Sequence, residues 1–294
     1  MNKPAIGFVG LGLMGSAMAR NLLSAGYGVT GFDIEPVKMD EAAALGAQTV
    51  KDPALLPPLV DILILSLPNS RVVDEVVHSS LKLFEAGRQG QTLIDTTTAD
   101  PLMSEQLATR LKKKGIQMLD ATISGTSKMC AAKDITFMVG GDSAAYTECE
   151  PIFAALGKKA YHLGKNGSGA LMKLIVNLVL GLNRFVLAEG LALGKAAGMD
   201  PHRTLDVLKN SAAYSKAMDM KGAKMIEKDF LPPEGKLAFH LKDVRLMLDL
   251  AQRLEFPVPL SGLHAQALTS LVAKGRDEWD NAAIISFYHD LTGS

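Results

Sequence analysis

A glycine-rich turn near the start of the chain has the spacing of a phosphate-binding site. It follows an apolar run at 5–9, precedes a helical pattern at 16–25, and reads Gly10-Leu11-Gly12-Leu13-Met14-Gly15. In such a turn the first glycine permits a tight bend, the second lets the backbone approach a pyrophosphate, and the third lets helix and strand pack closely. The pyrophosphate meets free N–H groups at the helix N-terminus. We therefore predict that residues 10–15 bind a dinucleotide. The alternative is a glycine-rich turn in another kind of parallel α/β protein.

An acidic residue, Asp33, ends the next apolar run, at 29–32, about 20 residues after the turn. A carboxylate at this place accepts hydrogen bonds from ribose hydroxyls and repels the 2′-phosphate of NADP. Glu35 adds negative charge, and Lys38 is the nearest cation. We expect NAD as the cofactor, with NADP as the alternative.

Lys173 and Asn177 are candidates for the chemical step. No P-loop lysine motif accompanies the glycine turn, which favours redox chemistry over phosphoryl transfer. Hydride transfer to a carbonyl needs a proton donor, and Lys173 can supply the proton. Asn177 lies four residues later, so both side chains share one helical face, where the amide could hold the amine or a substrate hydroxyl. Spacing alone does not separate this role from a lysine that extends to solvent.

Two further groups could bind anions. Ser124, Gly125 and Thr126 follow a strand pattern, and their N–H groups and hydroxyls could hold a carboxylate. An ordinary strand-to-loop turn is the alternative. Lys242 could reach a nucleotide or a carboxylate, or could simply pair with Asp243 or solvent. The six histidines lack metal-ligand spacing, so we expect no metal.

Alternating strands and helices must position these residues. The predicted strands are 5–9, 29–33, 62–66, 92–95, 117–121, 136–139 and 159–162. This alternation predicts a doubly wound, mostly parallel α/β sheet, which binds ligands at the carboxyl ends of its strands. The residues expected along that rim are Gly10–Gly15, Asp33, Leu67, Pro68, Asn69, Thr96, Thr97, Thr98 and Ser124–Thr126.

Helical patterns replace strands from about residue 164 onward. We predict a dinucleotide-binding domain at 1–163 and an all-helical domain at 164–294. A first helix at 167–197 would be about 45 Å long. Because it is so long and apolar, we expect it to form the spine of this domain and part of a homodimer or homotetramer interface. About four more helices should follow.

The composition excludes several partners and compartments. Of 294 residues, 48% are hydrophobic, and 31 basic residues balance 31 acidic ones, which favours neither nucleic acid nor a membrane surface. The two cysteines fit a reducing compartment, and no N-terminal signal segment is visible, so we expect a cytoplasmic protein. The apolar stretch 171–193 contains too many polar residues for a membrane span and is typical of a buried helix.

Together these residues resemble the β-hydroxyacid dehydrogenase family, which includes 3-hydroxyisobutyrate dehydrogenases, tartronate semialdehyde reductases and glyoxylate/succinic semialdehyde reductases. The resemblance covers nearly the whole chain. The segments that carry it are Phe8–Arg20, Asp120-Ala121-Thr122-Ile123-Ser124-Gly125-Thr126, Gly167–Asn177 and Lys242-Asp243.

The resemblance implies a Rossmann domain followed by a helical domain, as in 6-phosphogluconate dehydrogenase, and a role for each site residue. Lys173 would be the general acid/base, assisted by Asn177. The loop Ser124–Thr126 would hold the substrate carboxylate. Thr97 or Thr98 would contact the nicotinamide end, and Lys242 would lie near the cofactor.

Departures from the family pattern bear on the substrate and the cofactor. Thr126 in place of glycine and Val176 in place of asparagine match the glyoxylate/succinic semialdehyde reductase branch. That branch usually has an Asn-Arg pair where this chain has Phe32-Asp33, and it uses NADP. Thr122 replaces the usual proline. We expect an oxidoreductase that interconverts a short β-hydroxy acid and its semialdehyde or keto acid. The alternatives are 3-hydroxyisobutyrate or tartronate semialdehyde chemistry and a non-catalytic NAD-binding scaffold.

Overall fold

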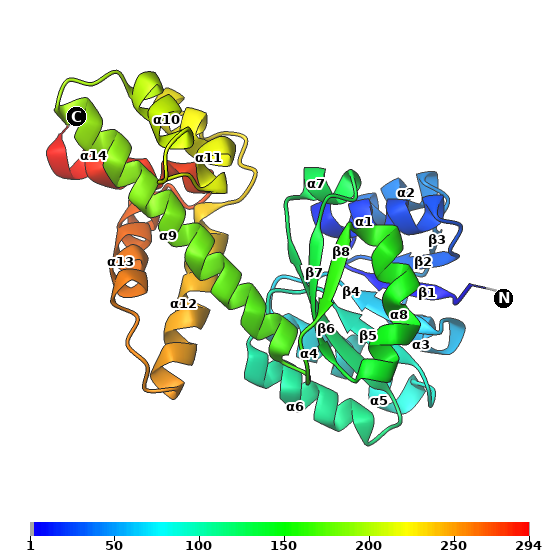
Figure 1. Ribbon diagram of the computed structural model, residues 1–294. Helices are drawn as coiled ribbons and strands as arrows, with labels where there is room; N and C mark the ends of the chain where they lie inside the picture. Colours follow the sequence, from blue (N-terminus) through cyan, green and yellow to red (C-terminus); the bar gives the residue numbers. More distant parts are fainter. Residues whose placement is uncertain (1–2, 294) are drawn as a thin grey trace. The chain divides into compact units, whose positions relative to one another are not determined.

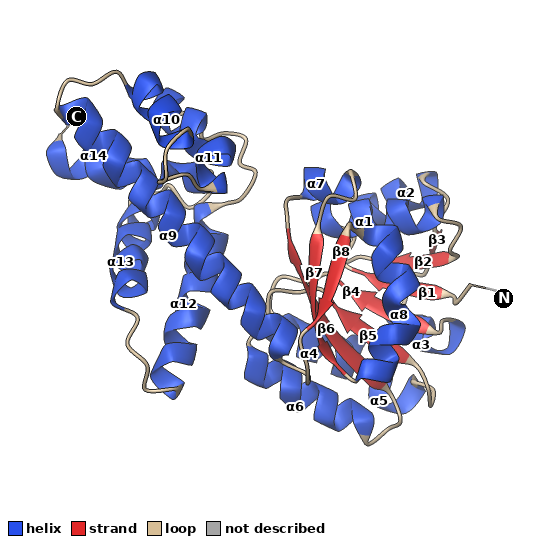
Figure 2. Cartoon of the chain, in the orientation of Figure 1, coloured by secondary structure: helices blue, strands red, loops and turns tan. Residues whose placement is uncertain are grey.

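The structure, a computed structural model, describes residues 3–293, and the chain divides between Lys173 and Leu174 into two compact units. We call the described residues 3–173 unit 1 and the described residues 174–293 unit 2. All described strands lie in unit 1, and unit 2 consists of helices and loops (Figures 1 and 2).

Unit 1 contains an eight-stranded sheet in the order β3-β2-β1-β4-β5-β6-β7-β8, in which only the β6–β7 pair is antiparallel. The strands are β1 (Ile6–Val9), β2 (Val29–Phe32), β3 (Gln48–Thr49), β4 (Ile62–Leu65), β5 (Thr92–Asp95), β6 (Gln117–Ser124), β7 (Thr136–Gly141) and β8 (Lys159–His162). The strand order reverses between β1 and β4. Ligands bind such sheets in the crevice at this reversal.

Helices cover both faces of the sheet, which is why β1 and β4 are apolar and β1, β4 and β5 are buried throughout. One core cluster packs the sheet against α1 (Leu13–Ser24), α2 (Pro36–Ala44), α7 (Ser127–Ala131) and α8 (Ser143–Leu156). The other packs it against α3 (Leu56–Leu59), α4 (Ser70–Glu75), η2 (Val76–Ser80), α5 (Leu83–Ala86) and α6 (Pro101–Lys112), with the short η1 (Pro53–Leu55) before α3. The predicted doubly wound α/β fold is thereby confirmed.

The strand predictions need correction at β3, β7 and β6. The sequence does not predict β3, because its two residues are exposed and carry no hydrophobic alternation. The strand predicted at 136–139 continues to Gly141 as β7. The strand predicted at 117–121 continues to Ser124 as β6, because its last residues pair with the antiparallel β7. This extension carries the strand up to the predicted substrate loop.

Unit 2 is built around α9 (Ser168–Ala196), whose first six residues belong to unit 1. The helices after it are α10 (Pro201–Lys209), α11 (Lys216–Glu227), α12 (Leu237–Arg253), α13 (Pro259–Ala273), η3 (Asn281–Ile285) and α14 (Ser286–Thr292), one α-helix more than expected. Prolines at Pro201 and Pro259 start two of them, since proline suits the first helical turn. One apolar cluster from these helices forms the core of unit 2.

By length and hydropathy alone, α9 could cross a membrane. Core helices of soluble proteins meet the same two criteria. Only 33% of its most apolar 18-residue window is buried, so much of its apolar surface is exposed rather than buried as predicted. The exposed apolar side chains on its unit 2 part include Ile175, Val179, Val186 and Leu193.

Candidate active site

The glycine turn after β1 has little room for side chains except at its centre. Gly10 has a φ of +90°, and a Cβ there would overlap the carbonyl oxygen of Ser66. A Cβ on Gly15 would overlap the carbonyl oxygen of Gly10, so α1 packs directly on the turn. Gly12, which precedes α1, has no atom within 4 Å of where its Cβ would lie. The turn therefore leaves open space beside the N–H groups that start α1, as a bound pyrophosphate requires.

Asp33 holds this turn in place. Its Oδ2 accepts a hydrogen bond of 2.6 Å from the Leu11 N–H, and its Oδ1 accepts one of 2.9 Å from the Glu35 N–H. The sequence predicts only ribose binding for Asp33 and gives no sign of these hydrogen bonds, which connect the end of β2 to the glycine turn. Lys38, the nearest cation, pairs with Glu41 at 2.9 Å. On α1, Leu13 is exposed and Met14 packs against the core.

The loops after β4 and β5 are tied together beside the glycine turn. The Thr97 hydroxyl accepts a hydrogen bond of 3.1 Å from the Leu67 N–H, next to Pro68. Asp95 accepts a hydrogen bond of 3.0 Å from the Thr97 N–H, one residue before Thr98. Burial raises the pKa of Asp95 to about 7, partly offset by these Thr97 contacts and increased by the charge of Asp120.

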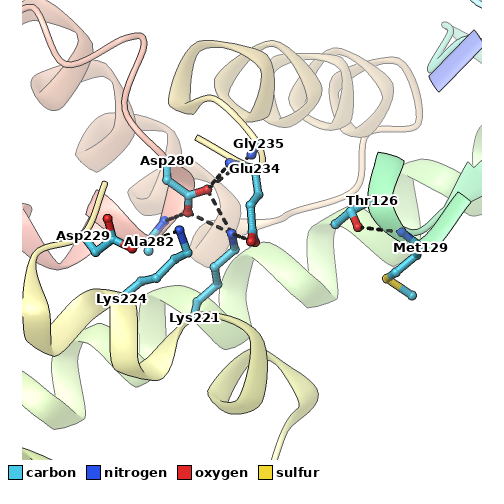
Figure 3. A network of polar contacts seen from close by, with 9 residues as sticks. All are labelled: Thr126, Met129, Lys221, Lys224, Asp229, Glu234, Gly235, Asp280 and Ala282. Carbon is cyan, nitrogen blue, oxygen red and sulfur yellow. Dashed lines mark hydrogen bonds and ion pairs between the residues drawn. The ribbon is translucent and has the colours of Figure 1, made fainter. Parts of the chain in front are cut away.

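Lys173 lies beside the predicted substrate loop. Its Nζ donates a 2.6 Å hydrogen bond to the carbonyl oxygen of Ile123, the residue before Ser124. Gly125 has a φ of +145°, and a Cβ there would press on Ile135. The Thr126 hydroxyl accepts a hydrogen bond of 3.3 Å from the Met129 N–H and caps α7 (Figure 3). Unit 1 therefore brings Lys173 and the loop 124–126 together.

Asn177 and Lys242, the other predicted site residues, both contact Asp243 within unit 2. Asn177 donates a 2.9 Å hydrogen bond to Asp243 Oδ2, and Lys242 Nζ lies 3.3 Å from Asp243 Oδ1. Asn177 is buried and lies four residues after Lys173 on the continuous helix α9. The sequence reading noted Asp243 only as a partner for Lys242 and missed its contact with Asn177.

A buried cation, Arg184, lies further along α9. Burial lowers the pKa of Arg184 to about 10, and the charges of Asp280 and Asp243 partly offset this. Arg184 in turn contributes, after burial itself, to lowering the pKa of His264 to about 4. Arg184 therefore stays charged and His264 stays neutral near pH 7.

Two buried acids in unit 1 receive no role of their own in the sequence analysis. Asp95 is the last residue of β5, and Asp120 lies within β6. The two residues are buried and lie opposite each other in the register of these strands. An acid inside a strand pattern is the signal that could have identified them, because a buried carboxylate must find hydrogen-bond donors. Within residues 3–293, no group of three or more His, Cys, Asp or Glu side chains is arranged to hold a metal ion.

Known proteins are similar to this chain in sequence and in fold. Residues 5–164 match the family model described as the NAD binding domain of 6-phosphogluconate dehydrogenase. Residues 167–288 match the model described as NAD-binding of NADP-dependent 3-hydroxyisobutyrate dehydrogenase.

Individual relatives match along the full length of the chain. A 2-(hydroxymethyl)glutarate dehydrogenase from Eubacterium barkeri is 32% identical over 98% of this chain and 96% of its own. Glyoxylate/succinic semialdehyde reductase 2 from Arabidopsis thaliana is 30% identical, covering 96% of this chain and 78% of its own. The solved structure of Mycobacterium tuberculosis 3-hydroxyisobutyrate dehydrogenase is 27% identical, with a TM-score of 0.90 and 99% of each chain covered.

Proposed function

The chain belongs to the β-hydroxyacid dehydrogenase family, and we propose that it is an NAD(P)-dependent oxidoreductase that interconverts a short β-hydroxy acid and its semialdehyde or keto acid. The observation that carries the catalytic part of this proposal is the position of Lys173. Its ammonium nitrogen is held 2.6 Å from the Ile123 carbonyl oxygen, next to the loop proposed to bind the substrate carboxylate.

In the reductive direction, the substrate carbonyl carbon gains a hydride and its oxygen gains a proton. The nicotinamide supplies the hydride when it is bound. Lys173 donates the proton to the developing alkoxide, which typically accelerates such a step by about 10²–10⁴-fold. The N–H groups and hydroxyls of Ser124, Gly125 and Thr126 bind the carboxylate and orient the carbonyl. Asn177 assists from the next turn of α9, oriented by its hydrogen bond to Asp243.

The proposed dinucleotide site consists of the backbone of residues 10–15, with Asp33, Leu67, Pro68, Thr97, Thr98 and Lys242. We propose NAD as the preferred form. Asp33 and Glu35 place negative charge after β2, which would repel the 2′-phosphate of NADP. Lys38, the nearest cation, forms an ion pair with Glu41. Initial rates with NADH and NADPH test this directly, and a preference for NADPH would contradict it.

We propose glyoxylate or succinic semialdehyde as the first substrates to examine, because Thr126 and Val176 match that branch of the family. Methylmalonate semialdehyde and tartronate semialdehyde represent the two alternative branches. Initial rates at 340 nm across these four acids, each with NADH and NADPH, would rank them. A protein that binds NADH but reduces none of them would favour a non-catalytic NAD-binding scaffold.

Replacing the proposed proton donor tests the mechanism. In Lys173→Ala we expect NADH to bind as in the wild type, while turnover falls by at least about 100-fold because the alkoxide loses its proton source. Lys195→Ala is the matched control, since this exposed lysine lies in the last turn of the same helix. Turnover near the wild-type value in Lys173→Ala would refute the role of Lys173.

We also propose a homodimer or homotetramer in which a second copy covers α9. Exposed apolar side chains recur at helical spacing along one side of α9, at Ile175, Val179, Val186 and Leu193. An exposed apolar stripe of this kind is typical of a protein interface. Val186→Glu should shift the mass measured by light scattering toward the monomer. An unchanged mass, or a monomeric wild type, would contradict this interface.

The remaining proposals concern domain limits and compartment. We propose residues 1–163 as the cofactor domain and 164–294 as the substrate and oligomerisation domain. We propose a reducing, cytoplasmic location, because the two cysteines, Cys130 and Cys149, are free rather than joined in a disulfide. The zero net charge supports neither a nucleic-acid nor a membrane partner.

A further inference from the structure

The start of α9 is held by an acid that precedes it by about fifty residues in sequence. Asp120, in the middle of β6, accepts a 2.8 Å hydrogen bond from the Gly167 N–H through Oδ1. Its Oδ2 accepts one of 3.0 Å from the Ala170 N–H. N–H groups in the first helical turn have no partner within the helix. Asp120 therefore caps the N-terminus of α9, a role that usually belongs to the residue immediately before a helix.

Thr122 holds the same helical turn from the same face of β6. Its side chain is buried, and its hydroxyl donates a 2.8 Å hydrogen bond to the carbonyl oxygen of Gly169. Gly169 has no space for a side chain, because a Cβ there would overlap the carbonyl oxygens of Asp120 and Met138. The backbone of α9 thus lies directly on β6 and β7, fixed by one carboxylate and one hydroxyl.

Lys173 follows Gly169 by one helical turn, and its ammonium group bonds Ile123, the residue between Thr122 and Ser124. One short piece of β6 therefore holds the start of the helix, the proposed proton donor and the proposed substrate loop. We propose that Asp120 and Thr122 are positioning residues that set the place of Lys173 relative to residues 124–126. This inference rests on the proposed function of Lys173 as the proton donor.

The physical reason is that proton transfer depends steeply on placement. A displacement of about 1 Å can cost about 100-fold in rate. Thr122→Val removes only the hydroxyl that fixes the Gly169 carbonyl, so we expect kcat to fall about tenfold. The KM for NADH should not change, because the glycine turn is untouched. Thr122→Ser keeps the hydroxyl and should restore most of kcat.

Asp120→Asn should have a larger effect than Thr122→Val. The amide nitrogen would face one of the two N–H donors of α9, so one hydrogen bond is replaced by a repulsive contact. If this variant does not fold, the Thr122 variants still decide the question. Ile152→Val is the control for stability, because this buried residue on α8 belongs to the core cluster on the other face of β6, away from Lys173. Such a substitution typically costs about 0.5–1.5 kcal/mol.

A double-mutant cycle separates positioning from other effects. We expect Thr122→Val to lower kcat in the wild-type background but to cause little further loss of kcat in Lys173→Ala. If Thr122 acts by positioning Lys173, its substitution has no effect on kcat when the Lys173 side chain is absent. The control Ile152→Val should lower the melting temperature without lowering kcat.

Each other result has a separate meaning. Equal losses from Thr122→Val with and without Lys173 would overturn the positioning role, as would wild-type kcat in Thr122→Val. Failure of Thr122→Ser to recover kcat would also overturn it. Wild-type turnover in Lys173→Ala would instead refute the proposed function itself, so the two failures are distinguishable.

Discussion

Two buried aspartates, one in each unit, both accept hydrogen bonds from backbone N–H groups, but a buried ammonium group bonds only the one in unit 2. Asp120 in unit 1 is 1% exposed and is held by backbone N–H groups of α9. Asp280 in unit 2 is 0% exposed, and Lys221 Nζ lies 2.9 Å from its carboxylate (Figure 3). The N–H groups of Glu234, Gly235 and Ala282 also donate to Asp280.

The two environments move the carboxyl pKa values in opposite directions. Burial raises the pKa of Asp120, and its backbone hydrogen bonds offset this only in part. Burial also acts to raise the pKa of Asp280, but the Ala282 N–H and the Lys221 ammonium outweigh it and bring that pKa below its usual value. The Ala282 N–H and the buried Lys221 ammonium together therefore keep the acid of unit 2 ionised. In unit 1, the acids hold backbone segments at the strand ends, where the proposed site lies.

The largest expected effect is the loss of the buried cation. Lys221→Met leaves Asp280 and Glu234 without the ammonium that bonds both, so unit 2 should lose about 3–5 kcal/mol of stability. Lys224→Met is the matched control on the same helix, because its more exposed pair with Asp229 contributes about 0–1 kcal/mol. Urea denaturation measures both. Similar midpoints for the two variants would remove the contrast between the units.

The next effect is a pH dependence that belongs to unit 1. Because the pKa of Asp95 is about 7 in the folded chain, the folded state binds more protons than the unfolded state between its ordinary pKa and pH 7. Wild-type stability from this residue should fall as pH rises through that window, by up to about 1.4 kcal/mol per pH unit. Asp95→Asn should remove this slope.

Denaturation midpoints of the wild type and Asp95→Asn at pH 5, 6 and 7 provide the measurement. The difference between the two proteins should shift in favour of the variant as pH rises. A pH-independent difference would show that Asp95 is ionised throughout. By contrast, the lowered pKa of Asp280 contributes stability that is present above its unfolded pKa and lost as pH falls through the lower folded value.

A third effect on stability comes from the close backbone approach that distinguishes unit 1. Gly15→Ala forces a Cβ into the Gly10 carbonyl, so we expect a loss of about 1–3 kcal/mol and weaker NADH binding. Gly12→Ala meets no atom within 4 Å and should keep its stability. If Gly12 lies against the pyrophosphate as proposed, this variant nevertheless binds NADH more weakly. Titration of NADH fluorescence and thermal melts separate the two outcomes.

Much of the fold could be predicted from local sequence patterns. The ends of β5 and β8 agree with the prediction residue for residue, and α9 starts and stops within one residue of its predicted limits. Apolar runs bounded by glycine or proline define such elements without reference to the rest of the chain. The prediction failed where pairing decides the limit, as in β3 and the last three residues of β6.

The features of the candidate site likewise differ in whether they depend on nearby or distant residues of the chain. The glycine turn at 10–15, Asp33 and the Lys173–Asn177 spacing are predictable from the order of amino acids, because each depends on residues close together in the chain. The folded chain is needed to show that Asp120 bonds N–H groups at the start of α9, 47 and 50 residues later, and that Lys221 pairs with Asp280, 59 residues away. A buried charge takes whichever donor the folded chain brings to it, and spacing along the sequence does not specify that donor.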